Sequence, residues 1–342
     1  MCYVDDPLAA LMGTPAVRRR NAALMVLVWE ALGFKLAYAK GQLDSEVTWI
    51  GGTMRAEPGG VRAWIKESLV SDIKIELSRL MASNIISHKD LHSLVGKLGH
   101  ASGLLIVMRP FLDPLWAALY SRDSKGAPSN TVWTKQIAVT LHWFQAFFTS
   151  GGNKIERFFS SEAYGRIGPI VEIGTDASPW GMGGWLSIDG TIKNFFACRL
   201  TEDDARIFDE KLDGSCVGQQ LWECLAILVA VDIWSKEWSE SRVVLKIRGD
   251  NVGALFLVVK MRPANAKQAI IARELALRFV ELSFPPDAIH TPGIAHVAAD
   301  ELSRVYAPKG SGIVNSSIHP SLRHATQTVV PPRNEAWYRA LQ

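Results

Sequence analysis

The apolar positions along the first half of the chain predict mainly helices. From Val61 to about Ser121, apolar residues recur at intervals of three and four, which is typical of amphipathic helices. Pro110 and Pro114 are expected to break this helical part. A polar linker, SRDSKGAPSN, comes next. The following stretch, TVWTKQIAVTLHWFQAFFTSGG, predicts one more helix, whose aromatic face is expected to fill a core.

The second half of the chain shows the shorter apolar runs that are typical of strands, separated by helical segments. Val171 to Asp176 and Gly183 to Ile188 predict two strands, and the Asp189-Gly190 turn predicts a hairpin to a third strand from Thr191 to Arg199. QLWECLAILVAVDIW is apolar almost all round, as expected of a helix that packs on a sheet, and we place its acid in the first turn. VVLKIRGD predicts a central strand, and a later strand is expected to end at His290.

Four carboxylates lie where a carboxylate is unusual, at the ends of apolar strands or inside apolar helical segments. They are Asp176, Glu223, Asp250 and Asp300. Burial of a carboxylate is costly unless a cation or a hydrogen-bond donor meets it. Two of them have a structural alternative, because Asp250 could cap the helix that begins at Asn251 and Asp300 could pair with Arg304 four residues later. We find no such alternative for Glu223.

The segments that hold these acids resemble a known family when they are taken together. TDASPWGMGGWL, LWECLAI, RGDNVGAL and HTPGIAHVAADELSR resemble, in order, the motifs of the ribonuclease H domain in reverse transcriptases of gypsy-type and DIRS-type retrotransposons. The resemblance covers about Gly165 to Pro308. It implies an α/β (α+β) fold, with a ribonuclease H-like mixed five-stranded sheet and flanking helices. One residue departs from the family, because His296 stands where asparagine is usual.

The resemblance also implies a catalytic site. The ligands of two Mg²⁺ ions, with Mn²⁺ as an alternative, would be the carboxylates Asp176, Glu223, Asp250 and Asp300. His290 would lie near them and could shuttle a proton. The implied reaction is endonucleolytic hydrolysis of the RNA strand of an RNA:DNA hybrid. The alternative is a retroelement remnant that binds nucleic acid without catalysis.

The N-terminal residues resemble another part of a reverse transcriptase. MCYVDD resembles the YxDD motif of the palm, which makes Asp5 and Asp6 a polymerase remnant. VTWIGGTMRAE resembles the hairpin that steadies the primer, and SLVGKLGHASGLL resembles a helical tract of the thumb. Because the family's other metal-binding aspartate would precede YVDD, we expect no DNA polymerase activity from this chain alone.

These resemblances divide the chain into four expected parts. They are a truncated palm at 1–60, a mainly helical thumb and connection at 61–160, a ribonuclease H-like domain at 165–308 and a loosely ordered tail at 309–342. The expected partners are an RNA:DNA hybrid and the fingers and palm portion of a reverse transcriptase, and no membrane partner is expected.

Composition adds only mild constraints. Lys and Arg total 37 against 34 for Asp and Glu, a formal charge of +3 that suits a polyanionic partner without requiring one. Basic residues around the third acid, which could line a phosphate track or form an ordinary solvated surface, are Arg248, Lys260, Arg262 and Lys267. The four cysteines show no pair with metal-ligand spacing, which favours a reduced intracellular compartment, nuclear or cytoplasmic.

Overall fold

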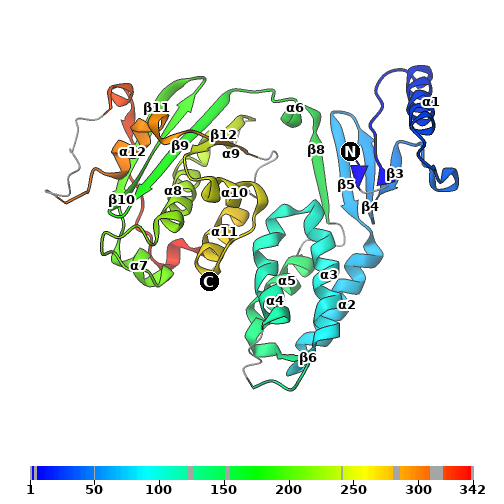
Figure 1. The fold of residues 1–342 in the computed structure, drawn as a ribbon, viewed down its shortest axis with the longest axis horizontal. Coiled ribbons are helices and arrows are strands. Elements are labelled where there is room, and N and C mark those ends of the chain that lie inside the picture. The colour runs from blue at the N-terminus through cyan, green and yellow to red at the C-terminus, as the bar shows by residue number, and fades with distance from the viewer. Residues whose placement is uncertain are drawn as a thin grey trace.

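The computed structural model describes residues 2–3, 6–49, 51–121, 126–150, 155–239, 242–279, 286–308 and 319–339. The chain forms two lobes that lie side by side along the long axis (Figure 1). One lobe contains the N-terminal half of the chain, and the other contains the large sheet formed by the second half. In the parts of the chain that the structure describes, none of the helices has both the length and the apolar character needed to cross a bilayer.

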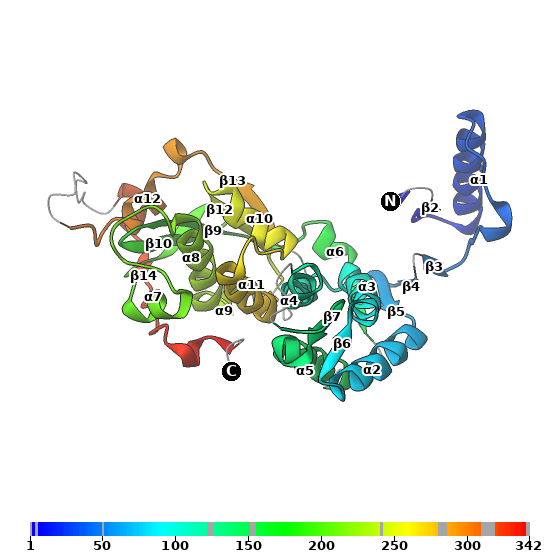
Figure 2. The same cartoon turned by 60° about the horizontal axis from the view of Figure 1, so that its bottom comes forward.

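The N-terminal segment stands at the outer end of the first lobe. Strands β1 (Cys2–Tyr3) and β2 (Asp6–Pro7) pair antiparallel, and helix α1 (Pro15–Ala31) follows, capped by the Thr14 side chain. None of the residues of α1 is buried, and Figures 1 and 2 show it standing away from the rest of the protein. A short 3₁₀ turn, η1 (Tyr38–Lys40), then leads to the first sheet.

The first lobe contains a four-stranded antiparallel sheet in the order β3-β4-β5-β8. Its strands are β3 (Glu46–Trp49), β4 (Gly52–Glu57), β5 (Gly60–Ile65) and β8 (Glu156–Ser160). The helical pattern predicted from Val61 is therefore wrong for its first residues, which form β5. There Ala63 and Ile65 are buried two residues apart, which is the period of a strand and not of a helix.

Four helices complete the first lobe below this sheet (Figure 1). They are α2 (Glu67–Met81), α3 (His88–Leu104), α4 (Arg109–Tyr120) and α5 (Thr134–Ser150). Between them, β6 (Ile85–Ser87) pairs with β7 (Thr131–Trp133), and the 3₁₀ turn η2 (Ile106–Met108) joins α3 to α4. The aromatic face of α5 fills the core as predicted, because Phe144 and Phe148 are buried and Trp143 stacks on Phe111.

The two prolines do not both act as the sequence predicts. Pro110 lies in the first turn of α4, where its missing N–H costs nothing. Pro114 lies inside the same helix without ending it. A proline leaves the carbonyl four residues earlier without its helical donor. Here that carbonyl belongs to Pro110, and it accepts a hydrogen bond of 3.3 Å from Arg273 Nε in the other lobe.

The second lobe is built on a mixed sheet in the order β13-β12-β9-β10-β11-β14. Its strands are β9 (Ile170–Ser178), β10 (Gly181–Ile188), β11 (Thr191–Arg199), β12 (Val244–Gly249), β13 (Asp287–His290) and β14 (Thr326–Gln327). β9, β10 and β11 are antiparallel, whereas β12 is parallel to β9 and β13 is parallel to β12. This confirms the predicted ribonuclease H-like fold class. The strand number differs, because β14 adds a sixth, parallel strand beside β11.

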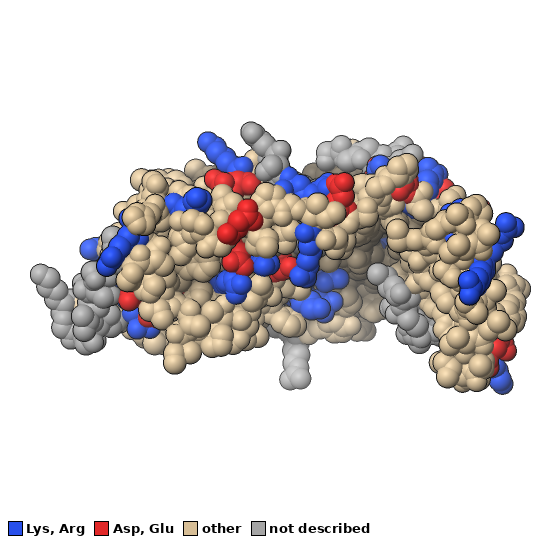
Figure 3. All heavy atoms as spheres, turned by 90° about the horizontal axis from the view of Figure 1, so that it is seen from above, with Lys and Arg blue, Asp and Glu red and all other residues tan. Residues whose placement is uncertain are grey.

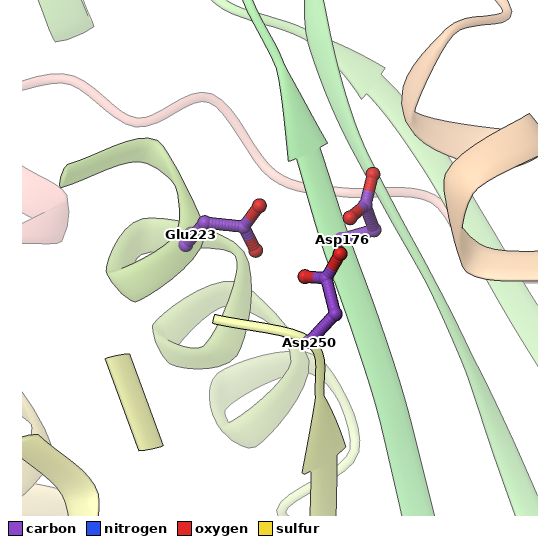
Figure 4. A group of neighbouring side chains, drawn as sticks. All are labelled: Asp176, Glu223 and Asp250. Carbon is purple, nitrogen blue, oxygen red and sulfur yellow. The ribbon is translucent and has the colours of Figure 1, made fainter. Parts of the chain in front are cut away.

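Helices cover both faces of this sheet. They are α7 (Glu202–Phe208), α8 (Gln219–Ile233), α9 (Lys236–Ser239), α10 (Val252–Lys260), α11 (Ala266–Phe279) and α12 (Val297–Ser303), with the turn η3 (Gly293–Ala295) before α12. The short helix α6 (Ser161–Tyr164) instead contacts β5 and β8 of the first lobe. α8 is buried along most of its length and packs on β9, with α10 and α11 against it. α12 packs on β9 and β10 from the other side (Figure 4). The two lobes meet where α11 contacts α4 and η2.

The C-terminal segment packs on the second lobe and differs from the loosely ordered tail that the sequence predicts. Residues 319–339 include η4 (Pro320–Leu322), β14 and η5 (Glu335–Trp337), whereas 309–318 lie outside the described residues. Arg333 is buried and forms two hydrogen bonds with Asp204 on α7, at 2.9 and 2.6 Å. Tyr338 is fully buried against Phe208. The segment is therefore anchored to the sheet by buried contacts.

Candidate metal centre

Three carboxylates from three separate elements point toward one another beside β9 (Figure 4). Asp176 lies in β9, Glu223 is the fifth residue of α8, and Asp250 directly follows β12. Each offers one oxygen, and these oxygens all lie within 4.8 Å of one another. The sequence singles out all three residues, and the structure brings them together. Glu223 begins the second turn of α8, just after the first turn in which we predicted it.

The fold explains why these three residues meet. β12 is parallel to β9 and pairs with it, so the two strands end at the same edge of the sheet and place Asp176 and Asp250 side by side. The helix α8 packs on β9 and brings Glu223 to the same point. Asp250 does not cap α10, which is the structural alternative that the sequence left open. The capping side chain is that of Asn251, which accepts a hydrogen bond from Ala254 N at 3.0 Å.

Burial alone does not distinguish this group, but the absence of basic partners does. Within the described ranges, the buried carboxylates are Glu76, Asp176, Asp204, Glu223 and Glu274. Three of these form ion pairs, which are Glu76 with Lys97, Asp204 with Arg333 and Glu274 with Arg278. Among the same described residues, Asp176 and Glu223 form no ion pair with a basic side chain. They face each other and Asp250 instead.

This arrangement raises the proton affinity of both buried acids. The pKa of Asp176 rises from the ordinary 3.8 to about 7, chiefly through burial and also through the charges of Asp250 and Asp300, while a hydrogen bond from Ser303 opposes the rise. The pKa of Glu223 lies well above its usual value, because the side chain is buried and the charges of Asp176 and Asp250 repel its ionised form. Without a cation, the group therefore retains protons near neutral pH.

The donor set fits a hard divalent cation. Such cations prefer carboxylate oxygens, and their charge removes the repulsion that raises the pKa values of Asp176 and Glu223. Each of the three side chains can supply an oxygen without any change of backbone, since the ligand atoms already converge. Soft ligands are not involved, because the group contains neither cysteine nor histidine. The geometry is therefore that of a candidate metal centre.

Asp300, which the resemblance implies as a fourth ligand, lies near this group but is not one of the three converging acids. Its carboxylate forms an ion pair with Arg304, which is the structural alternative that the sequence left open. Burial raises the pKa of Asp300, Arg304 lowers it, and the charge of Asp250 raises it again. The influence of Asp250 places Asp300 within electrostatic reach of the centre.

A serine that the sequence analysis missed joins the helix of Asp300 to the strand of Asp176. Ser303 Oγ lies 2.6 Å from Asp176 Oδ2, to which it donates, and 2.9 Å from the backbone oxygen of Asp300. Ser178 Oγ donates in turn to the Ser303 backbone oxygen at 2.7 Å. The sequence contained one signal for this residue, because Ser303 follows Asp300 by three residues and a helix places such residues on the same face. Ser303 thus fixes one oxygen of Asp176 and leaves the other free.

The close approach of α12 to the sheet depends on Gly183. An added Cβ at this position would collide with Leu302 and lie 2.6 Å from the backbone nitrogen of Ser303. Gly183 is the residue that pairs with Asp176 across β9 and β10. Only glycine lets α12 lie against the strand at the level of Asp176.

The two histidines of this region have different surroundings. His290 is the exposed last residue of β13 and pairs in register with Gly249, next to Asp250 in the chain. His296 is buried, and its Nε2 lies 2.8 Å from the Thr175 carbonyl oxygen. His296 therefore fastens the start of α12 to β9 beside Asp176. It occupies the position where the family usually has asparagine and forms a hydrogen bond of its own.

Gln219 is a second residue that the sequence analysis missed. Its Nε2 donates to Glu223 Oε1 at 3.1 Å and also contacts the carbonyl oxygen of Ala177, beside Asp176. It lies one turn before Glu223 on α8, which is the spacing that could have drawn attention to it. Gln219 thus links α8 to the end of β9.

Of the two aspartates expected to be a polymerase remnant, Asp6 lies apart from this centre in the fold. Asp6 belongs to β2, at the outer end of the first lobe. Asp5 lies outside the described residues, as does the side chain of Asp6.

Comparisons with known proteins gave structural neighbours alone. No family model and no curated protein matches the chain. Three matching solved structures are of foamy viral protease-reverse transcriptase, each aligned over 82% of this chain. One, called dRH, is bound to double-stranded DNA (TM-score 0.34, 12% identity), one to an RNA/DNA hybrid (0.30, 13%) and one to double-stranded DNA (0.31, 12%). This chain spans 44%, 34% and 52% of the lengths of those chains, respectively.

Proposed function

We propose that this chain is a divalent-metal-dependent ribonuclease that cuts the RNA strand of RNA:DNA hybrids. One observation carries the proposal: Asp176 and Glu223 are buried carboxylates without basic partners in the described part of the chain, and their oxygens converge with that of Asp250. Structural stability gives no reason to keep such a group, because its charges repel each other. A phosphodiester-hydrolysing metal site gives that reason.

The described residues support a division of roles. Mg²⁺, with Mn²⁺ as an alternative, would supply Lewis-acid activation of water and neutralise the charge of the phosphate when it is bound. Asp176, Glu223 and Asp250 would hold one cation. Asp300 would contribute to a second one after release from Arg304. Ser303 and Gln219 would keep the acids of the first site in place through the hydrogen bonds described above.

The reaction adds water across one P–O bond of the RNA backbone. The water oxygen bonds to phosphorus, the bond to the leaving ribose oxygen breaks, and a proton from water ends on that leaving oxygen. His290 would carry a proton between the site and solvent, because it is exposed and is the last residue of β13, which pairs with β12 next to Asp250. The hybrid would be recognised by its shape and its 2′-hydroxyls, so cleavage should depend little on sequence and strongly on salt.

The charge distribution supports a polyanionic substrate. Figure 3 shows Lys and Arg side chains gathered near the middle of one face, beside Asp and Glu side chains. Two of the four basic residues that the sequence places around the third acid have acidic partners, since Arg248 pairs with Glu172 and Lys267 pairs with Glu210. Lys260 and Arg262 have no ion pair among the described residues, which leaves them available to phosphates.

Cleavage of a labelled RNA:DNA hybrid by the purified protein with Mg²⁺ tests this function. We expect cleavage of the RNA strand, no cleavage of duplex RNA, and loss of activity in the Asp176→Asn variant. Glu172→Gln is the matched control, because Glu172 lies on the same strand but pairs with Arg248 and Lys246, outside the three converging acids. A folded sample that binds the hybrid and does not cut it would exclude the ribonuclease.

A second candidate function is hybrid binding without catalysis. The observation in its favour is the ion pair between Asp300 and Arg304, which keeps the fourth implied acid engaged. The same experiment separates the two candidates, because a binding protein would retain affinity for the hybrid while the wild-type chain and Asp176→Asn were equally inactive.

A further inference from the structure

Three basic residues lie close together in the fold at the junction of the two lobes, where the first residue of α4 contacts the backbone at the end of α10. Arg109 is the first residue of α4, and its Nη1 lies 3.3 Å from the backbone oxygen of Lys260, the last residue of α10. Arg262 is exposed two residues further on. Burial lowers the pKa of the Arg109 guanidinium, and the positive charge of Arg262 lowers it further. The two guanidinium groups are therefore close enough to repel each other.

One acid lies near this group, but it forms no ion pair with it. Arg109, Lys260 and Arg262 have no ion pair within the described ranges, and the first turn of α4 contains no acidic residue. The acid at the junction is Asp113, whose Oδ2 is buried without a hydrogen-bond partner. Burial raises the pKa of Asp113 to about 6, and the charges of Arg273 and Arg262 counteract the rise. A single carboxylate thus stands among several cations.

Arg273 has a structural role at this junction. Its Nε donates to the Pro110 carbonyl that Pro114 leaves without a helical donor, and its guanidinium lies 5.8 Å from the centre of the Phe111 ring. Arg109 has one structural contact, its hydrogen bond to the Lys260 carbonyl oxygen, whereas Arg262 forms no ion pair among the described residues. Arg109 also stands at the N-terminus of α4, where the helix dipole adds to the positive potential. Like charges held together at a helix N-terminus are the arrangement that binds an anion.

We propose that Arg109, Lys260 and Arg262, here called the junction cations, bind a backbone phosphate of duplex nucleic acid. The proposal rests on the proposed function for the identity of the duplex. α10 begins two residues after Asp250 and ends at Lys260, so its nine residues separate the junction cations from the acids by about 13 Å. That distance corresponds to about four base-pair steps along a duplex.

The surface between the acids and the junction cations suits the same ligand. Phe256 on α10 is 59% exposed, and the Lys260 Nζ lies 5.8 Å from the centre of its ring. Val252 and Val259 are exposed on the same helix. Exposed apolar side chains beside cations can pack against the sugars of a duplex while the cations meet its phosphates. A duplex that lies along α10 would reach the acids and the junction cations together.

Binding of an RNA:DNA hybrid to the Asp176→Asn protein tests the proposal without cleavage. The double variant Arg109→Gln/Arg262→Gln in that background is expected to bind about tenfold to a hundredfold more weakly, and its salt dependence should fall by about one phosphate contact. The matched control is Arg19→Gln/Arg20→Gln, because these two arginines lie on the exposed helix α1 at the outer end of the first lobe, away from the junction. Equal losses in the control pair would overturn the proposal, as would an unchanged salt dependence in the junction pair.

Single neutral methylphosphonates in the hybrid locate the contact. One placed about four base pairs from the cleaved bond should weaken binding of the parent protein, and this loss should disappear in the junction variant. A loss that persists in the variant would show that another part of the protein contacts that phosphate. Thermal unfolding confirms that each variant is folded. Cleavage by the chain with Asp176 intact is measured separately, so a protein that binds through these cations but does not cut would refute the nuclease and leave the junction site standing.

Discussion

Asparagine at position 176 is expected to stabilise the metal-free protein at neutral pH while it abolishes cleavage. The pKa of Asp176 is 3.8 in an unfolded chain and about 7 in the folded one. At 1.36 kcal/mol for each pH unit, this difference corresponds to about 4 kcal/mol of folding free energy that is lost when the buried carboxylate ionises. Asparagine removes the charge and still offers an oxygen to Ser303. We therefore expect a gain of about 2–4 kcal/mol at pH 8.

The sign of this effect depends on pH. Between pH 3.8 and about 7 the folded protein keeps the proton of Asp176 and the unfolded chain loses it. The stability contributed by this group is therefore fully present below pH 3.8 and falls as the pH rises through 7. The advantage of Asp176→Asn should consequently be close to zero at pH 4 and reach its full size at pH 8.

The same substitution at another buried aspartate gives the opposite expectation. Asp204 is fully buried, but it is held by two hydrogen bonds from Arg333. Removal of one partner of a buried ion pair leaves the other charge uncompensated and costs about 3–5 kcal/mol. Asp204→Asn should therefore destabilise the protein at both pH values. Two buried aspartates of one lobe would then respond in opposite directions to one chemical change.

Urea and thermal unfolding in EDTA at pH 4 and pH 8 measure both effects. A change of 2–4 kcal/mol should move the midpoint of thermal unfolding by roughly 5–15 °C in a lobe of this size. Addition of Mg²⁺ at pH 8 should stabilise the wild-type protein and have a smaller effect on Asp176→Asn. The reasoning is refuted if Asp176→Asn is no more stable than the wild type at pH 8, or if its gain is as large at pH 4.

Three further outcomes are expected from the same site. Ser303→Ala should raise the Mg²⁺ concentration needed for stabilisation and for cleavage by about tenfold or more, because a hydrogen bond to a charged group contributes about 1.5–3 kcal/mol. An unchanged affinity of the variant for Mn²⁺ in isothermal titration would contradict this expectation. The cleavage rate should rise as the pH passes about 7, where Asp176 loses its proton. The midpoint of this rise should move to lower pH at higher Mg²⁺ concentration, because the cation competes with the proton. A midpoint that does not depend on Mg²⁺ in pH–rate profiles would count against this expectation. Gly183→Ala should push α12 from the sheet, lower stability by about 1–3 kcal/mol and reduce cleavage, whereas unchanged unfolding and activity would show that α12 tolerates the added methyl group.

The sequence contains enough information for the main sheet and for the three converging acids. The Asp189-Gly190 pair adopts the left-handed conformations that a tight hairpin requires, so the register of β10 and β11 follows from local chemistry. The acids were recognisable because each ends an apolar strand or interrupts an apolar helix, although for Asp250 the sequence also left a capping role open. Local patterns of this kind depend on neighbouring residues and are visible without a structure.

The features that the sequence could not supply depend on distant contacts. The segment 319–339 reads as polar and rich in proline, yet Arg333 is ordered by Asp204, 129 residues earlier in the chain. Pro114 reads as a helix breaker, but its effect is offset by Arg273, which lies 163 residues from the Pro110 carbonyl that it contacts. β5 was misread because Val61 to Ile65 also fits the start of a helix, and only pairing with β4 and β8 selects the strand.

The pairing of charges, and not their burial, is what separates the candidate centre from the rest of the core. Glu274 lies in the apolar helix IIARELALRF much as Glu223 lies in QLWECLAILVAVDIW, and both are buried. Sequence separates these two, because Glu274 has Arg278 four residues later and Glu223 has no basic residue three or four positions away. Asp204 has a local partner in Thr201, with which it forms a capping box, but its basic partner Arg333 is remote in the chain. Only the folded arrangement shows that Asp204 meets a guanidinium whereas Asp176 meets two other carboxylates, and this difference favours a cation at the site of Asp176 and not at that of Asp204.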